Sequence, residues 1–382
     1  MSGQMSQSLV KQNLVSGMRP TGKLHIGHYL GVLRNWVQLQ NSEKYNCFFF
    51  IADWHSLTTK ISEETELESN IIEVARDFLA CGLDPNKSTI YVQSAIPEIA
   101  ELHLLLSMIT PNNWAERDPT LKDLVRAAAN SKKKILVDSV APSDQNEHKG
   151  SLDMAPPVKE AGEVTKTDGE KSNLTYGMLG YPVLQTSDIL TFRGYFVPVG
   201  KDQEAHLEMS RDIANRFNYL FETDFFPEPK PLFTETPTVK GTDGGKMSKS
   251  FNNDIKISAT EEETWLQVKK MITDTQRIKR TDPGDTDRCL VPFTYYKIFA
   301  EPEVINKTKL ECETALRGCM DCKKLLAEVI NNYFKEIREK RQLFSDAEIL
   351  SILEEGNLKA QSKAKETLKK VRELMQIPDW KS

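Results

Sequence analysis

The first ninety residues alternate between short apolar runs and amphipathic stretches. Runs at 13–16, 46–52 and 89–93 have the length of strands. The middle run is almost wholly apolar, as expected for a strand in a sheet that is covered on both faces. Between these runs, the spacing of apolar residues predicts helices over 26–40 and 64–81. Strand, helix, strand, helix and strand in this order predict an α/β fold with a Rossmann-like parallel sheet.

The pattern changes twice further along the chain. Residues 130–172 are rich in Lys, Glu, Ser and Pro and contain no aromatic residue, which predicts a disordered insertion. The α/β pattern then resumes with a helix over 181–192, a strand over 196–199 and a helix over 206–216. From 261 to 372 the predicted elements are almost all helices. We therefore expect three parts, which are an N-terminal tail (1–13), an α/β domain (14–260) interrupted by the insertion, and a C-terminal α-helical domain (261–382).

Composition is that of an ordinary globular protein, with 39% hydrophobic and 27% charged residues. The longest apolar run, 47–52, is far shorter than the roughly 18 residues of a membrane span. The N-terminus lacks the apolar stretch of a secretory signal and the arginines of a transit peptide. We therefore expect a cytoplasmic protein without membrane contact. The net charge of −5 does not favour nucleic-acid binding by the whole chain, although a local basic patch would suffice for it.

The predicted turn between the first strand and the first helix carries the sequence GKLHIGH, residues 22–28. Gly27 allows a ligand to approach the backbone closely, and the N-terminus of the helix offers free N–H groups and a positive dipole end to a polyphosphate. His25 and His28 add donors that can stabilise charge on a phosphate as pyrophosphate leaves. Two histidines three positions apart are, on their own, more typical of a surface or of a metal site.

A glycine-rich segment later in the chain leads into the sequence KMSKS, which comprises Lys246, Met247, Ser248, Lys249 and Ser250. A mobile loop with two lysines is suited to clamping a polyphosphate during a transition state, although most such stretches are solvated loops. The tetrapeptide HIGH at residues 25–28 and the pentapeptide KMSKS at 246–250 together form the joint signature of class I aminoacyl-tRNA synthetases. The chain closely resembles that class.

One predicted helix carries a polar stripe in an apolar setting. Tyr181, Gln185 and Asp188 are spaced i, i+4 and i+7, so their side chains share one helix face. A carboxylate there can accept a hydrogen bond from an indole N–H or from a phenol O–H. The spacing therefore predicts a site for an aromatic amino acid and leaves both tryptophan and tyrosine open.

Several blocks resemble the tryptophanyl-tRNA synthetases in particular. They are SGMRPTG (16–22), DWHSLTT (53–59), VPVGKDQ (197–203) and the stretch 206–217. The resemblance implies ATP-dependent activation of L-tryptophan with Mg²⁺ on the phosphates, transfer to tRNA(Trp), and a homodimer. The alternatives are a tyrosyl-tRNA synthetase and a non-catalytic tRNA-binding paralogue.

The resemblance also implies roles for individual residues. Catalytic charge stabilisation falls to His25, His28, Lys246 and Lys249. Asp188 would accept the indole N–H, and the rest of the tryptophan site would be Tyr181, Gln185, His55 and Gln203. The ATP contacts would be Arg19, Pro20, Thr21, Gly27, His28, Gly200, Lys201, Asp202, Val239, Lys246, Met247, Ser248, Lys249 and Ser250. Lys201 stands where the family usually has Glu, so no side-chain role transfers to that position.

Four of the six cysteines lie close together in the helical part, at Cys289, Cys312, Cys319 and Cys322. Structural zinc usually draws on two close pairs, and here only the last two cysteines form one. Four thiolates also suit a 4Fe–4S cluster. The spacing resembles that of bacterial tryptophanyl-tRNA synthetases that carry this cluster. We therefore predict a 4Fe–4S cluster that shapes the anticodon-binding surface, with Zn²⁺ as the alternative metal.

Overall fold

The computed structural model describes residues 11–60, 66–117, 175–200, 204–233, 239–378 and 380. The predicted insertion at 130–172 lies outside these residues, as does most of the predicted N-terminal tail. Among the described residues, no helix is both long and apolar enough to cross a membrane.

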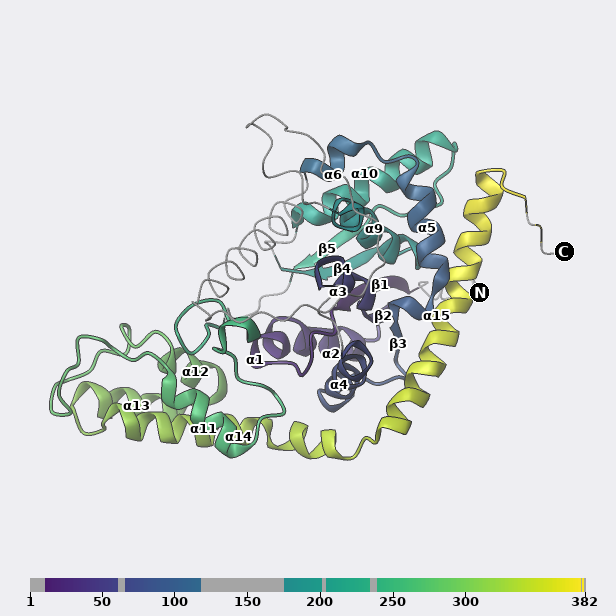
Figure 1. Ribbon diagram of the computed structural model, residues 1–382. Coiled ribbons are helices and arrows are strands. Elements are labelled where there is room, and N and C mark those ends of the chain that lie inside the picture. Colours follow the sequence, from purple (N-terminus) through teal and green to yellow (C-terminus); the bar gives the residue numbers. More distant parts are fainter. Residues whose placement is uncertain are drawn as a thin grey trace, which may run out of the picture.

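A sheet of five parallel strands forms the centre of the molecule, in the order β3-β2-β1-β4-β5 (Figure 1). The strands are β1 (Gln12–Met18), β2 (Tyr45–Ile51), β3 (Ser88–Val92), β4 (Phe196–Val199) and β5 (Lys230–Phe233). The direction of winding reverses between β1 and β4, so a crevice opens there at the carboxyl ends of the strands, where such sheets bind their ligands. The predicted α/β fold is confirmed, and the four predicted strands all form. Strand β5 has no counterpart among the predicted elements.

The predicted helix over 26–40 forms without a break, but its hydrogen-bonding pattern changes along its length. It consists of α1 (Ile26–His28), a π-helical segment η1 (Tyr29–Leu33) and α2 (Arg34–Asn41). A π-helical turn widens the helix by one residue and is frequent at functional sites. Here it directly follows the HIGH tetrapeptide, while Leu30 and Leu33 remain buried. Apolar spacing does not reveal such a turn, because the buried face is kept.

The other helices of the α/β part pack on both sides of the sheet. Three were predicted, namely α4 (Leu67–Ala80), α9 (Tyr181–Thr191) and α10 (Glu204–Leu220). The others are α3 (Asp53–Lys60), η2 (Gln93–Ala95), α5 (Pro97–Ser107), α6 (Asn112–Arg117) and α8 (Tyr176–Leu179). On one face of the sheet, Trp36 stacks on Phe49 at 4.7 Å between ring centres and meets Phe78 edge-on at 5.5 Å. Full burial of one such ring stabilises the fold by about 1.5–3 kcal/mol.

Beyond the KMSKS segment, whose end overlaps the short helix η5 (Lys249–Phe251), the named elements of the described chain are all helices. The helices are α11 (Glu261–Lys270), α12 (Pro292–Phe299), α13 (Pro302–Glu313), α14 (Cys319–Gln342) and α15 (Asp346–Leu374). Helices α11 to α14 form one end of the molecule, and α15 returns along the α/β part past β3 and α5 (Figure 1). Ser345 and Glu348 form a capping box that starts α15 sharply after α14.

Helix α15 covers the open edge of the sheet at β3. The amide of Asn357 accepts a hydrogen bond from the Val92 N–H at 2.9 Å. Gly356 lies so close to the strand that a Cβ atom there would be 1.8 Å from the carbonyl oxygen of Ile90. Only glycine permits this approach, and the exposed strand edge is thereby protected from other chains.

Helix α14 is joined to the HIGH segment through a buried carboxylate. Arg341 Nε donates to Asp77 Oδ1 at 2.7 Å, and the other oxygen of Asp77 accepts the Leu24 N–H at 2.8 Å. Asp77 is fully buried, and a buried charge of this kind is stable only when it is paired. The arginine of the helical part therefore holds the backbone that leads into His25.

Candidate active site

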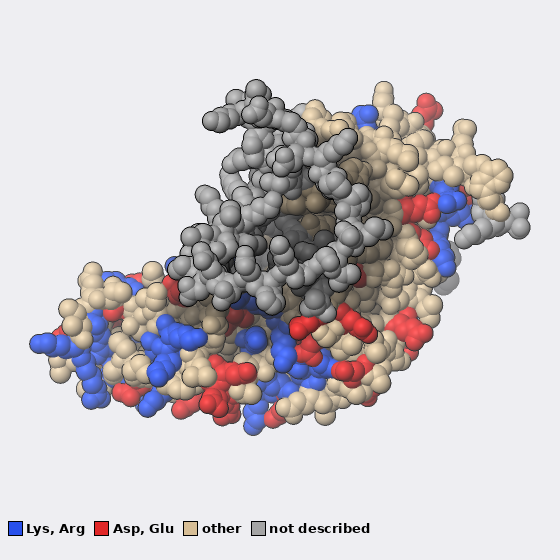
Figure 2. Space-filling model, viewed as in Figure 1, with Lys and Arg blue, Asp and Glu red and all other residues tan. Residues whose placement is uncertain are grey.

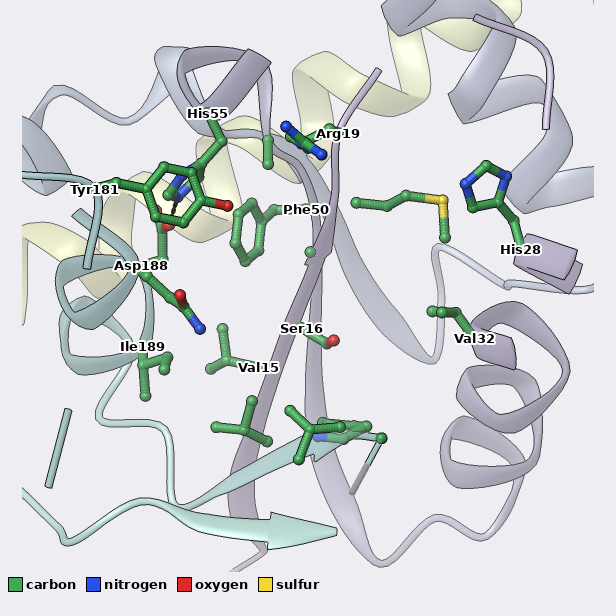
Figure 3. A pocket seen from close by; sticks show the side chains of 18 of the residues that line it. Val15, Ser16, Arg19, His28, Val32, Phe50, His55, Tyr181, Asp188 and Ile189 are labelled. Atoms are coloured by element: carbon green, nitrogen blue, oxygen red, sulfur yellow. Dashed lines mark hydrogen bonds and ion pairs between the residues drawn. The ribbon is translucent and has the colours of Figure 1, made fainter. Parts of the chain in front are cut away.

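A cavity of about 400 Å³ opens at the carboxyl ends of β1 and β4, at the reversal of the sheet. Its walls come from the end of β1, the start of the HIGH helix, one face of α9 and the end of β4. Figure 3 shows Asp188, His55 and Tyr181 on one side of the β1 backbone, and His28 and Val32 on the other. The cavity therefore has two compartments, one beside α9 and one beside the HIGH segment.

Asp188 forms the base of the compartment beside α9. It is only 1% exposed, and both of its oxygens take a hydrogen bond. Oδ1 accepts the amide N–H of Gln93, and Oδ2 pairs with His55 Nε2, each at 2.7 Å. Each carboxylate oxygen has two acceptor positions, and the described residues use one on each oxygen, which leaves the other for a ligand.

Burial raises the pKa of Asp188, and the hydrogen bonds from His55 and Gln93 oppose this change. When His55 donates from Nε2, its Nδ1 atom becomes an acceptor. That Nδ1 atom is buried and has no hydrogen-bond partner among the residues that the structure describes. Tyr181 closes the compartment, with its ring edge-on to His55 at 4.4 Å. The compartment thus offers acceptors beside an aromatic wall, which fits a flat ligand that carries an N–H or O–H group.

The two HIGH histidines hold each other in place. His25 Nδ1 accepts the backbone N–H of His28, and His28 Nδ1 accepts the backbone N–H of His25, both at 3.3 Å. The rings stack at 3.7 Å. Burial lowers the pKa of His25 to about 4 and that of His28 to about 3, so both rings are neutral near pH 7. Because each Nδ1 acts as an acceptor, each ring carries its proton on Nε2 and can donate from there.

The KMSKS segment is folded around one buried amide. Asn253 donates to the carbonyl oxygen of Lys246 at 3.0 Å and to Asp243 at 2.8 Å, and it accepts the Ser248 N–H at 2.8 Å. Gly241 has to be glycine, because a Cβ atom there would lie 2.3 Å from the Asn253 amide nitrogen. The amide of Asn253 therefore sets the shape of the loop before any ligand binds.

Lys249 lies across the entrance to the HIGH segment. Its ammonium donates to the carbonyl oxygen of Thr21 at 2.6 Å. Burial lowers the pKa of Lys249 to about 8, against the opposing effect of Asp254 and Asp77. The ammonium acts electrostatically on both His25 and His28, and a cation beside two neutral N–H donors suits the binding of an anion.

The structure brings eight of the predicted site residues to the lining of the cavity. Those that line it are Arg19, Thr21, His28, His55, Tyr181, Gln185, Asp188 and Gly200. His25 and Gly27 lie directly behind His28, where a Cβ atom on Gly27 would be 3.0 Å from the ring of His25. Pro20 is buried between two lining residues. Val239 is not a lining residue and packs in the core with Met247. Lys201, Asp202 and Gln203 lie outside the described residues.

Two residues of the site carry no motif that would have marked them. Gln93 follows the last residue of β3, is fully buried and holds Asp188. Its only sequence signal is a polar residue at the carboxyl end of a parallel strand, where functional residues gather. Asn253 follows the KMSKS segment by three positions, and its role becomes visible only when the loop is folded.

The four predicted cysteine ligands line one small cavity in the helical end of the molecule, with Arg277, Arg317 and Lys323. Cys319 and Cys322 begin α14, Cys312 lies near the end of α13, and Cys289 precedes α12. Burial raises the pKa of Cys289 to about 12 and that of Cys322 to about 11. Within the described part of the chain, no three His, Cys, Asp or Glu residues are gathered closely enough to hold a metal ion as they stand. Figure 2 shows that Lys and Arg side chains are frequent over this end of the molecule, mixed with acidic ones.

The family model described as tRNA synthetases class I (W and Y) matches residues 9–140 and 150–335. A tryptophan--tRNA ligase of Aquifex aeolicus is 42% identical over 96% of this chain and 100% of its own length. One from Thermotoga maritima is 40% identical over 95% of this chain and 99% of its own length. These similarities span both the α/β part and the helical part.

Solved structures agree with the sequence comparisons. The tryptophanyl-tRNA synthetase of Campylobacter jejuni complexed with ADP and tryptophan has a TM-score of 0.76 and 31% identity, and it covers 96% of this chain and 100% of its own. A tyrosyl-tRNA synthetase of Archaeoglobus fulgidus has a TM-score of 0.57 at 17% identity. The second likeness is one of fold alone.

Proposed function

The chain belongs to the class I tryptophanyl-tRNA synthetases, and we propose that the cavity between β1 and β4 is where it activates tryptophan with ATP. It is a tryptophan--tRNA ligase by this membership. Tryptophan would occupy the compartment beside α9, and ATP the compartment beside the HIGH segment. The observation that carries this assignment is Asp188, which is buried, held by two N–H donors and left with free acceptor positions.

The proposed reaction has two steps. The carboxylate of tryptophan attacks the α-phosphate of ATP, which forms tryptophanyl-adenylate and releases pyrophosphate. The terminal ribose hydroxyl of tRNA(Trp) then takes the tryptophanyl group, and AMP leaves. No covalent bond to the protein is needed, so the rate gain comes from positioning and from stabilising charge. Mg²⁺ would neutralise part of the charge on the phosphates.

Each side of the cavity has its own task in this proposal. His25 and His28 would donate from Nε2 to the phosphates, and Lys249 would bring its positive charge from Thr21 to the leaving pyrophosphate. On the other side, the indole N–H of tryptophan would satisfy Asp188. Phenylalanine has no such donor and would leave a buried acceptor unpaired, which is costly. Lys246, Ser248, Ser250 and residues 200–203 stay predicted ATP or tryptophan contacts.

Substrate-dependent pyrophosphate exchange tests this assignment. We expect exchange with tryptophan and ATP, and at most trace exchange with tyrosine at the same concentration. Exchange driven by tyrosine would favour the tyrosyl alternative. Absence of exchange with either amino acid, in protein that binds tRNA, would favour a non-catalytic paralogue.

We also propose that the four clustered cysteines hold a 4Fe–4S cluster, with Zn²⁺ as the alternative. Support comes from the common cavity lined by all four thiols and from the three cationic side chains around it, which would offset the negative charge of a thiolate-bound cluster. Cys319 lies in the first turn of α14, where the helix dipole favours a thiolate. The cluster would tie α12, α13 and α14 together, and this end of the molecule would present the anticodon-binding surface.

Cys322→Ser is expected to remove most bound iron and to reduce tRNA charging about tenfold or more, because the helices at the anticodon surface would lose their link. Tryptophan-dependent exchange should stay within about twofold, since no residue that lines the cavity between β1 and β4 also lines the cysteine cavity. Metal analysis after anaerobic purification distinguishes iron from zinc. Cys47→Ala, in the α/β part, is the matched control. Unchanged charging by the serine variant would contradict the role at the anticodon.

The resemblance further supports a homodimer and a cytoplasmic location as proposals. Leu104 on α5 and Met108 directly after this helix are exposed apolar residues that would suit a contact between two copies of the chain. Sedimentation of the purified protein measures the assembly directly.

A further inference from the structure

One acidic residue near the proposed ATP compartment lacks the hydrogen bonds that a buried carboxylate needs. Asp254 is only 7% exposed, and its Oδ2 atom is buried without a hydrogen-bond partner in the described ranges. Buried carboxylates almost always have donors or a positive charge beside them. The charge of Asp254 therefore requires a compensating group that moves or binds close by.

The backbone of Asp254 is clamped between the HIGH and KMSKS motifs. The residue before it, Asn253, holds the KMSKS loop through three hydrogen bonds. The residue after it, Ile255, accepts the Ile26 N–H at 2.9 Å, and the Ile257 N–H reaches the carbonyl oxygen of Leu24 at 2.9 Å. Asp254 thus occupies a fixed position from which its charge acts on both motifs.

Charged and titratable groups of the described chain interact with Asp254 and with Lys249. Asp254 interacts electrostatically with His25, with Lys249 and with the phenol of Tyr295. That phenol donates to the carbonyl oxygen of Lys240, so it does not satisfy the carboxylate. Lys249 itself also faces Asp77, which favours its charged form, and Lys256, which opposes it. The positive charges of Lys249 and Arg19 help to lower the pKa of His28. On the HIGH side, the ammonium of Lys249 donates to two neutral oxygens of Thr21, the carbonyl at 2.6 Å and the hydroxyl at 3.5 Å.

We propose that Asp254 is a positioning residue for ATP activation, the buried counter-charge that keeps the ammonium of Lys249 protonated and close to the HIGH segment until the triphosphate arrives. The proposal rests on the proposed role of Lys249 at the leaving pyrophosphate. When ATP binds, its phosphates replace the Thr21 oxygens as hydrogen-bond partners of the ammonium and take over from Asp254 as its counter-charge. Lys249 is then free to follow the pyrophosphate.

Removal of the negative charge of Asp254 is expected to lower the pKa of Lys249. In Asp254→Asn, burial acts on Lys249 with less opposition, so its pKa falls from about 8 by about one unit. The value of kcat/KM for ATP reports the free enzyme, and it should fall about eightfold relative to the unsubstituted protein at pH 8.5. Near pH 6.5 the two proteins should differ by less than about twofold, because Lys249 is protonated in both. The two HIGH histidines, with pKa values of about 4 and 3, stay neutral throughout this range.

Two measurements test the proposal on the full-length protein. The first is the pH profile of tryptophan-dependent exchange for the unsubstituted protein, Asp254→Asn and Asp254→Glu, with Glu262→Gln on the exposed face of α11 as the matched control. The second is acylation of Lys249 by an amine-selective reagent without ATP, followed by mass spectrometry across pH. We expect a labelling midpoint near 8, a lower one in Asp254→Asn, and restoration in Asp254→Glu.

Equal labelling midpoints in the unsubstituted protein and Asp254→Asn would overturn the proposal, as would a loss of exchange that is the same at every pH. Labelling needs no turnover, so a protein without exchange activity would refute the proposed function and leave this test intact. If circular dichroism shows that Asp254→Asn does not fold, the smaller Asp254→Ser replaces it in both measurements.

Discussion

Asp188→Asn is expected to lower kcat/KM for tryptophan about 100-fold or more, with KM for ATP nearly unchanged. A hydrogen bond to a charged group contributes about 1.5–3 kcal/mol, and leaving a buried polar group unpaired adds to the loss. Asparagine keeps the shape of the side chain, but its NH₂ group would face either His55 or Gln93. The N–H group of His55 or Gln93 would then point at the new NH₂ group instead of at an acceptor. The side chain would turn away, and the acceptor for the indole N–H would be displaced.

Steady-state exchange kinetics with tryptophan and ATP varied separately measure this effect. Asp212→Asn, an exposed carboxylate on α10, is the matched control and should behave as the unsubstituted protein. If Asp188→Asn kept its tryptophan KM and instead raised the KM for ATP, the assignment of the two compartments would be reversed.

His28→Ala should reduce kcat for tryptophan-dependent exchange about 100- to 1,000-fold, the usual effect of removing one preorganised donor to a developing charge. Tryptophan binding, measured by equilibrium dialysis, should hardly change, because His28 lies on the other side of β1 from Asp188 (Figure 3). Since burial lowers the pKa of His28 to about 3, we expect no acidic limb from this residue between pH 5 and pH 8.

The donor position can be tested by replacement of His28 with two amides. A glutamine N–H can reach the position of Nε2, whereas an asparagine N–H corresponds to Nδ1. Because His28 Nδ1 is an acceptor in the capping box, Gln should retain more activity than Asn. Equal activity of the two variants would mean that the proton of His28 is not confined to Nε2.

Much of the sheet could be predicted from the sequence because each strand can be recognised from its own short run of apolar residues. The run 46–52 is apolar on both faces, and Tyr181, Gln185 and Asp188 share a helix face whatever the tertiary fold. Strand β5 escaped prediction because it is four residues long and lies among prolines. The π-helical turn at Tyr29–Leu33 escaped because it changes the hydrogen bonds and keeps the apolar face.

The partners of the site residues could not be predicted in the same way. Gln93 meets Asp188 across 95 positions of sequence, and Arg341 meets Asp77 across 264. Such pairs depend on how strands and helices are stacked, which no local pattern encodes. The same limit applies to the cysteines. Their spacing is compatible with either a 4Fe–4S cluster or Zn²⁺, and the geometry of the four thiols depends on how α12, α13 and α14 pack.

Because α15 covers the free edge of β3, that edge is unprotected while the protein is being synthesised on the ribosome. Strands β1, β2 and β3 emerge early, yet the helix that carries Gly356 and Asn357 is nearly the last element to be synthesised. At about 5–20 residues per second, the edge of β3 stays uncovered for roughly tens of seconds in every nascent chain. During that interval the bare strand edge can pair with a neighbouring nascent chain, so this edge is where we expect chaperones to engage the growing protein.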